Sequence, residues 1–113
     1  MKYIVYKTTN LINNYIYIGV HKTQDPNIFD SYIGCGVYIN KPYTYEKAKT
    51  KFQQAVKEFG TSNFRRETLA IFDTDVEAYE LEEKLVKENF LARPDVYNMV
   101  LGGKINTTEG ITV

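Results

Sequence analysis

Apolar and polar residues alternate in two short segments near the start of the chain, both rich in β-branched and aromatic residues. The alternation places Tyr6 on one face of residues 2–9 and Tyr17 on one face of residues 15–20. A period of two with these residue types predicts β-strands. Residues 10–14 between them contain three asparagines, which tolerate left-handed backbone and bond their own main chain. The pattern therefore predicts a hairpin with a loop of about five residues.

Helical spacing follows in two later stretches. In residues 46–59 apolar side chains recur at steps of three and four, and Gly60 is a natural stop. Thr74 with Glu77 three positions later matches a capping box, so a second helix should begin there and run to about Phe90.

The remaining segments are shorter or less regular. Residues 64–72 read as a third strand, and residues 97–101 as a short additional strand. Residues 21–45 are punctuated by proline and glycine and follow neither period. Residues 104–113 are polar and are expected to form a frayed tail. The predicted order is strand, strand, helix, strand, helix, without an internal repeat.

Composition narrows the class of protein. A chain of 113 residues suits one domain, and 43% hydrophobic with 25% charged residues is typical of a globular protein. The sequence contains no apolar run long enough for a bilayer and no signal-peptide pattern, so a soluble intracellular protein without membrane contact is expected. The lone Cys35 cannot form an intramolecular disulfide, which agrees with a reducing compartment.

The formal net charge is zero, but the charges are unevenly distributed. Residues 1–57 carry eight lysines against three carboxylates, whereas residues 58–113 carry six lysines and arginines against eleven carboxylates. A basic half could contact phosphates, and an acidic half could supply a metal ligand. The alternative is that both halves are simply solvated. Charge alone favours this alternative, because dedicated nucleic-acid binders are usually basic overall.

Glu82 is the residue most in need of an explanation. Four apolar residues lie three and four positions from it on the second predicted helix, so its carboxylate falls within the apolar stripe. Burying an unpaired carboxylate costs several kcal/mol, on the order of the penalties measured for isolated buried charges. A divalent cation would offset that cost. Equally, Glu82 could reach water at the edge of the stripe or pair with a lysine.

Tyr6 and Tyr17 are two of ten tyrosines, most of which must be ordinary amphipathic packing residues. They are distinguished by their spacing and by Gly19, since glycine beside an aromatic residue on a strand permits close approach of another group. A phenol has an ordinary pKa near 10, so a nearby cation is required for it to act as a base at neutral pH. His21, the only histidine, and Lys22 follow directly and are candidates for contact with a phosphate.

Other chemistries find little support. A zinc site needs several cysteine and histidine ligands, and the chain has one of each. There is no Walker loop and no serine nucleophile motif. A second Tyr-Ile-Gly run at residues 32–34 could form a phosphate-binding loop, but a plain turn is the favoured interpretation.

Taken in order, these pieces resemble the GIY-YIG nuclease family, closest to its free-standing phage homing endonucleases. The resemblance covers residue 3 to about residue 103. It rests on a set of motifs whose order and spacing match the family: Tyr6, Tyr17-Ile18-Gly19, the helical Glu82 with Leu85-Val86-Lys87, Tyr97-Asn98, and Gly102-Gly103.

The resemblance implies an α+β fold in which a three-stranded antiparallel sheet is flanked by helices, with residues 1–103 as a nuclease domain. It implies hydrolysis of DNA with one divalent metal, Mg²⁺ or Mn²⁺, bound by Glu82. Tyr6 would be the general base, Tyr17 would support it or the phosphate, and Asn98 would help to orient the site. The implied location is the cytoplasm, that of the host if the chain is phage-encoded.

Two departures from the family pattern leave alternatives open. Ile4 stands where the family has its first glycine, and no arginine precedes Arg65, although the family's catalytic arginine usually follows the Tyr-Ile-Gly strand. His21 and Lys22 are the nearest substitutes, with Lys49 and Lys51 behind them. A catalytically inactive DNA-binding or inhibitory module is the principal alternative, and a protein-interaction domain is a third. The oligomeric state is left open.

Overall fold

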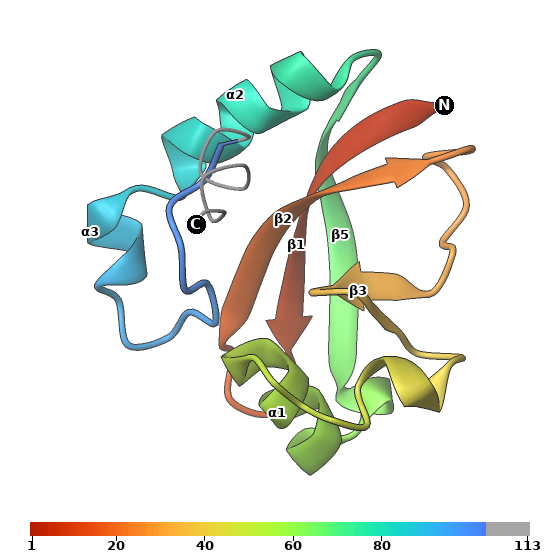
Figure 1. The fold of residues 1–113 in the computed structure, drawn as a ribbon, viewed down its shortest axis with the longest axis vertical. Coiled ribbons are helices and arrows are strands. Elements are labelled where there is room, and N and C mark those ends of the chain that lie inside the picture. Colours follow the sequence, from red (N-terminus) through yellow and green to blue (C-terminus); the bar gives the residue numbers. More distant parts are fainter. Residues whose placement is uncertain (104–113) are drawn as a thin grey trace.

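A computed structural model of the chain describes residues 1–103, and its central element is a three-stranded antiparallel sheet in the order β2-β1-β5 (Figure 1). The strands are β1 (Lys2–Asn10), β2 (Ile16–Thr23) and β5 (Phe64–Phe72). This confirms the expected α+β fold and the strand predicted at residues 64–72. The polar tail predicted for residues 104–113 lies outside the described residues.

The first two strands form the predicted hairpin, with a five-residue loop between Asn10 and Ile16. Asparagines build the turn as their chemistry predicts. Asn14 has a φ of 65°, and the Asn13 side chain accepts a hydrogen bond from the Tyr15 amide. The second strand runs to Thr23, three residues beyond its predicted end.

A second hairpin occupies part of the segment that showed no period. It consists of β3 (Tyr32–Gly34) and β4 (Val37–Tyr38), followed by the 3₁₀ turn η1 (Pro42–Thr44). Strands of three and two residues are too short to show alternation. The Thr8 hydroxyl donates a 2.6 Å hydrogen bond to the Ile33 carbonyl, which holds this hairpin against the face of β1 that carries Tyr6.

Helix boundaries differ from the sequence prediction at two places. The first helix, α1 (Lys51–Phe59), begins at residue 51 and not at residue 46, because Ala48 has a φ of 44°, which a right-handed helix does not allow. Thr50 then caps the helix with a reciprocal capping box through Gln53.

The predicted helix over residues 74–90 is two helices, α2 (Asp75–Leu85) and α3 (Glu88–Leu91). Val86 ends α2 in a non-helical conformation, and Lys87 is extended. The strand predicted at residues 97–101 is wrong, because this segment has no strand and only the preceding Val96 forms a bridge, to Ile16. The short 3₁₀ turn η2 (Thr61–Asn63) leads into β5.

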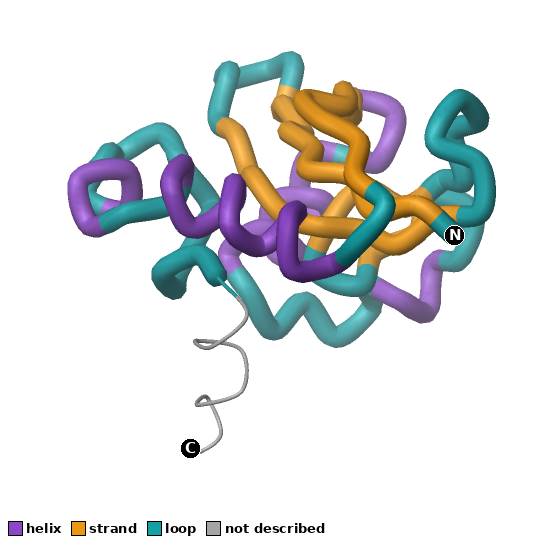
Figure 2. The backbone as a smooth tube through the Cα atoms, turned by 90° about the horizontal axis from the view of Figure 1, so that it is seen from above, coloured by secondary structure: helices purple, strands orange, loops and turns teal. Residues whose placement is uncertain are grey.

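Two hydrophobic clusters cover opposite faces of the sheet. One joins Val5 and Ile18 to Ala78 of α2, and the other surrounds Phe52 of α1. Figures 1 and 2 show α2 along one side of the sheet, with α1 beside the end where β1 stops and β5 begins. No helix within residues 1–103 is long and apolar enough to cross a membrane.

Candidate active site

The two tyrosines singled out by spacing lie on the same face of the sheet, one register step apart. Tyr6 is directly opposite Gly19 and Tyr17 is opposite Thr8, so the phenols are diagonal neighbours and not a direct pair. Their ring centroids are 6.2 Å apart. The register therefore brings the two side chains together while leaving a glycine beneath the end of the Tyr6 ring.

Glycine is needed at that position because the phenols occupy the space that a side chain would fill. A Cβ atom on Gly19 would lie 2.6 Å from the Tyr6 hydroxyl oxygen and 3.0 Å from the Tyr17 ring. Gly34 of β3 approaches the same rings, and its φ of 136° favours glycine on backbone grounds as well. Both Tyr-Ile-Gly runs thus converge on one point, although only the first pairs with β1.

The phenols open into a cavity of about 220 Å³, here called the tyrosine cavity, at the β2 edge of the sheet. Its walls come from β1, β2, the β3–β4 turn, α2 and the segment before residue 104. The lining residues with polar or ionisable side chains are Tyr6, Tyr17, Tyr32, Cys35, Tyr79, Glu82 and Asn98. Four of the six predicted site residues therefore share one cavity: Tyr6, Tyr17, Glu82 and Asn98.

Glu82 enters the tyrosine cavity from α2. One carboxylate oxygen accepts a 3.0 Å hydrogen bond from the Gly103 amide. Burial raises the pKa of the Glu82 carboxyl, and the Gly103 amide opposes only part of that rise. Among residues 1–103 no lysine or arginine forms an ion pair with it. The apolar stripe is narrower than predicted, because Leu85 is exposed while Ala78 and Val86 are buried.

The glycine pair at the end of the described chain allows this contact. A Cβ atom on Gly102 would lie 2.4 Å from the Glu82 carbonyl oxygen, so only glycine lets the segment pass this close to α2. The Gly102 amide also donates to the Val86 carbonyl, 2.9 Å away, at the end of the helix. The crossing thereby places the Gly103 amide against the Glu82 side chain.

Three phenols and the thiol of the tyrosine cavity have raised pKa values, so they keep their protons at neutral pH. Burial, followed by the neighbouring Tyr32 and Tyr17 phenols, raises the pKa of Tyr6 well above its usual value. Burial likewise raises the pKa values of Tyr17, Tyr32 and the Cys35 thiol. Tyr6 donates a hydrogen bond to Tyr32, and Tyr17 donates one to Cys35. No lysine, arginine or histidine is among the described residues that line the cavity.

Asn98 is committed to the backbone of β2. Its side-chain amide donates to the Ile18 carbonyl at 2.8 Å, and its side-chain oxygen accepts from the Ile18 amide at 3.0 Å. It therefore acts as a strand partner for the edge of the sheet between Tyr17 and Gly19. This contact agrees with an orienting role, although the role itself stays a prediction.

His21 lies outside the tyrosine cavity, separated from Tyr6 by one aromatic ring. It sits within β2 and not past its end as predicted, because the strand continues to Thr23. The imidazole stacks on Tyr32 with centroids 4.1 Å apart, and Tyr32 meets Tyr6 edge-on at 6.0 Å. Its Nε2 atom lies 2.6 Å from Oδ2 of Asp30.

Asp30 joins this histidine to a buried arginine that sequence reasoning did not select. The Arg66 guanidinium donates to Oδ1 of Asp30 at 3.0 Å and to the Tyr32 carbonyl at 2.9 Å, and its side chain is only 4% exposed. Burial by itself would raise the pKa of the Asp30 carboxyl, but hydrogen bonds from His21 and the Tyr32 amide, with Arg66 nearby, leave it below its usual value. A partial signal was available, because alternation along residues 64–72 puts Arg66 on the same face as the buried Phe64, although only pairing with β1 places it opposite Thr8.

Lys22 points to the other face of the sheet. It pairs with Tyr3 in the register, and its Nζ atom lies 6.0 Å from the Tyr3 ring centroid. Together with His21 it lines a separate cavity of about 370 Å³ beside residues 23–30. The structure therefore does not bring Lys22 to the tyrosine cavity.

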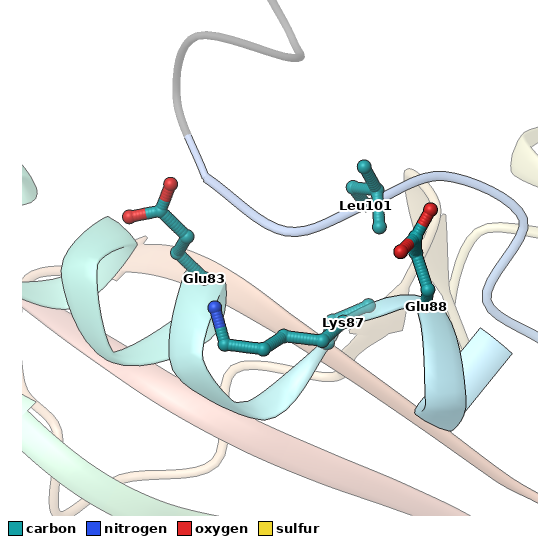
Figure 3. A pocket seen from close by; sticks show the side chains of 5 residues that line it. Glu83, Lys87, Glu88 and Leu101 are labelled. Carbon is teal, nitrogen blue, oxygen red and sulfur yellow. The ribbon is translucent and has the colours of Figure 1, made fainter.

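A further cavity lies on the far side of the segment that ends at Gly103. Figure 3 shows its labelled side chains: Glu83 of α2, Lys87 between α2 and α3, Glu88 at the start of α3, and Leu101 of that segment. Leu101 also lines the tyrosine cavity, so one stretch of chain contributes to both walls. The cavity in Figure 3 contains none of the predicted site residues.

Comparison with known proteins finds relatives among phage endonucleases. The chain is 42% identical over 106 residues to "Putative endonuclease segD" of Enterobacteria phage T4, covering 94% of this chain and 41% of that protein. It is 42% identical over 104 residues to "Putative endonuclease segB" of the same phage, covering 92% of this chain and 40% of that protein. "Putative endonuclease segE" is 40% identical over 114 residues, with coverage of 98% and 48%.

The chain thus spans less than half the length of these relatives. No protein-family model matches it. No solved structure matches it either.

Proposed function

We propose that residues 1–103 form a GIY-YIG-type nuclease domain that hydrolyses DNA phosphodiester bonds with one divalent cation, Mg²⁺ or Mn²⁺. The observation that carries this proposal is the convergence of Tyr6, Tyr17, Tyr32 and Glu82 on one cavity. The names of the phage T4 relatives support it, since each is called an endonuclease or a putative one. A cytoplasmic location, in the host if the chain is phage-encoded, belongs to the same proposal.

The residues present fit a weakly held Mg²⁺ ion. Within residues 1–103 no group of three or more histidine, cysteine or acidic side chains could form a complete protein cage. Mg²⁺ does not need one, because it commonly binds through one or two carboxylates and keeps waters and substrate phosphate oxygens as its other ligands. The Glu82 carboxylate, raised in pKa by burial, is the group a cation would stabilise.

In this proposal Glu82 holds the metal, which when bound polarises the phosphate and stabilises the leaving oxygen. The Tyr6 hydroxyl donates a hydrogen bond to Tyr32. The Tyr6 oxygen is then available to accept a hydrogen bond from the attacking water. Tyr17 would donate to a phosphate oxygen in place of its hydrogen bond to Cys35. Asn98 keeps the β2 backbone fixed beneath both phenols.

The test is cleavage of supercoiled plasmid with and without Mg²⁺ or Mn²⁺. Glu82→Gln should lose most of the cleavage, because it removes the charge that holds the cation. Glu83→Gln is a matched control, since it removes an exposed charge from the adjacent position of the same helix. Cleavage that is absent in every divalent metal, or equal in the two variants, would contradict the proposal.

Metal binding can be measured independently of cleavage. Divalent cation should raise the melting temperature of the unmodified protein and of Glu83→Gln, because a ligand that binds only the folded state stabilises it. Glu82→Gln should show a smaller rise or none. Equal shifts in all three proteins would place the cation elsewhere.

A second candidate function is DNA binding without catalysis. It is favoured by the lack of a lysine, arginine or histidine among the described lining of the tyrosine cavity. This alternative predicts salt-sensitive DNA binding that needs no metal and leaves the plasmid intact. Metal-dependent cleavage that is lost in Glu82→Gln would exclude it.

A further inference from the structure

Lysines are concentrated at the first residue of α1 and in the segment before it, on one side of the tyrosine cavity. Residues 41–51, here called the basic segment, contain four lysines and the single carboxylate Glu46. All four lysine side chains are exposed, and none forms an ion pair with another described residue: Lys41, Lys47, Lys49 and Lys51. Lysines without carboxylate partners keep their full charge available for an anionic partner.

Hydrogen bonds connect the basic segment to the wall of the cavity, partly through Gln53, whose side-chain oxygen accepts from the Lys49 and Thr50 amides. Cys35 lines the cavity, and its carbonyl accepts a 2.8 Å hydrogen bond from the Gln53 side chain in the first turn of α1. The Thr50 side chain, which caps the same helix, also bonds to the Cys35 thiol. Lys49 and Lys51 flank Thr50 in the chain, so these two charges lie beside that wall.

The opposite wall has the opposite charge. Glu82 belongs to α2, which carries five carboxylates against the single lysine Lys84. Figure 1 shows α1 beside one end of the sheet and α2 along a different side of it. Charges of one sign on each side set up a field across the cavity that extends about 8 Å into solvent at physiological salt.

We propose that the basic segment is the DNA-binding track of this domain, with Lys49 and Lys51 contacting backbone phosphates next to the one bound in the tyrosine cavity. This inference rests on the proposed nuclease function for the identity of the partner. A polyanion approaching from the α2 side would meet exposed carboxylates, whereas one approaching over the basic segment meets unpaired ammonium groups. DNA therefore enters from the side of α1 and of the β3–β4 hairpin.

The experiment measures DNA affinity as a function of salt in a cleavage-deficient background. Glu82→Ala protein without divalent metal is titrated onto a fluorescent duplex over a range of NaCl concentrations. Lys49→Gln/Lys51→Gln is compared with Lys84→Gln/Lys87→Gln, which removes the same net charge from exposed positions on the acidic side. Each phosphate contact contributes about 0.9 to the slope of log affinity against log salt, so losing two contacts should lower the slope by about 1.8.

The slope of log affinity against log salt should fall in Lys49→Gln/Lys51→Gln and not in Lys84→Gln/Lys87→Gln. Equal slopes in the two double variants would overturn the proposal that DNA binds along the basic segment. Undetectable DNA binding by the parent protein at low salt would overturn it as well. Failure of the nuclease proposal gives a different result, because metal-dependent plasmid cleavage would then be missing while the difference in slope persisted. Conversely, if cleavage depends on Glu82 but the salt slope of DNA affinity is unchanged in Lys49→Gln/Lys51→Gln, the basic segment does not bind DNA and the nuclease proposal stands.

Discussion

Replacing Gly19 with alanine tests whether the tyrosine cavity is as tightly constructed as its geometry indicates. The new Cβ atom would lie 2.6 Å from the Tyr6 hydroxyl oxygen and 2.9 Å from the adjoining ring carbon. Real Cβ atoms essentially never come this close to another heavy atom, so the Tyr6 ring must move. Tyr6 is 1% exposed and is hydrogen-bonded to Tyr32, which leaves it little room to do so.

Two effects of opposite sign set the magnitude. Gly19 does not have a positive φ, so alanine is compatible with its backbone and would stabilise the fold by about 0.4–1 kcal/mol through the unfolded chain. Overpacking a well-filled site costs about 1–3 kcal/mol. The net loss in the free energy of unfolding should be about 1–2 kcal/mol, a fall in melting temperature of roughly 5–15 °C for a domain of this size.

The effect on catalysis should exceed the effect on stability. Displacing a catalytic group by about 1 Å can reduce a rate on the order of 10²-fold. Gly60→Ala is the control, because its φ of 87° disfavours alanine but it does not line the tyrosine cavity. The assays are urea unfolding and initial rates of plasmid cleavage at a temperature where both variants are folded. A Gly19→Ala variant as stable as the parent, or one that cleaves no more slowly than Gly60→Ala, would refute the reasoning.

Four further substitutions test other parts of the structure. Asp30→Asn should be destabilising near neutral pH, and because the pKa of Asp30 is lowered in the folded state, its deficit in urea unfolding should shrink as the pH falls through that pKa. Glu82→Gln should be more stable than the parent at pH 7 without metal and equal to it at acid pH, since the raised pKa of Glu82 means that ionisation weakens the fold. Asn98→Ala should lose roughly 2–4 kcal/mol in the same assay, because two buried backbone groups of Ile18 lose their partners. Ala48→Gly should raise the melting temperature by relieving about 1 kcal/mol of left-handed strain.

The hairpin and the third strand could be predicted because alternation and asparagine chemistry are local properties of the sequence. The Thr74 cap and the Gly60 stop are local signals too and are confirmed, whereas the start of α1 and the end of α2 could not be predicted, because each depends on the backbone conformation of one residue. Ala48 has good helical propensity but a φ of 44°, and Val86 continues the apolar spacing of α2 while ending the helix. Hydrophobic periodicity records which side chains are buried and does not record where the backbone turns.

The candidate site shows the same division. Tyr6, Tyr17, Glu82 and Asn98 could be selected from sequence order, and they share one cavity. Tyr32 could not, because its contact with Tyr6 depends on the β3–β4 hairpin folding back over the sheet, which no local pattern encodes.

Arg66 shows that a cation can reach the neighbourhood of the tyrosines from a strand distant in sequence from the Tyr-Ile-Gly strand. The guanidinium comes from β5, far along the chain, and reaches the tyrosine face only through strand pairing. Its Nη1 atom donates to Asp30 and to the Tyr32 carbonyl, however, so it supports the aromatic stack and does not line the cavity.

This arrangement limits how charge can enter the tyrosine cavity. Its described lining holds one carboxylate, Glu82, and the pKa values of the Tyr6, Tyr17 and Tyr32 phenols and of the Cys35 thiol around it are raised. A DNA phosphate arriving alone would meet like charge at low dielectric, and a divalent cation arriving alone would have a single protein carboxylate to bind. The cation neutralises the charge of the phosphate, and the phosphate gives the cation further oxygen ligands, so each should strengthen the binding of the other. By linkage, the two ligands must strengthen each other's binding by the same factor. In the proposed nuclease, substrate therefore completes the metal site, which accounts for a catalytic centre built around only one acidic side chain.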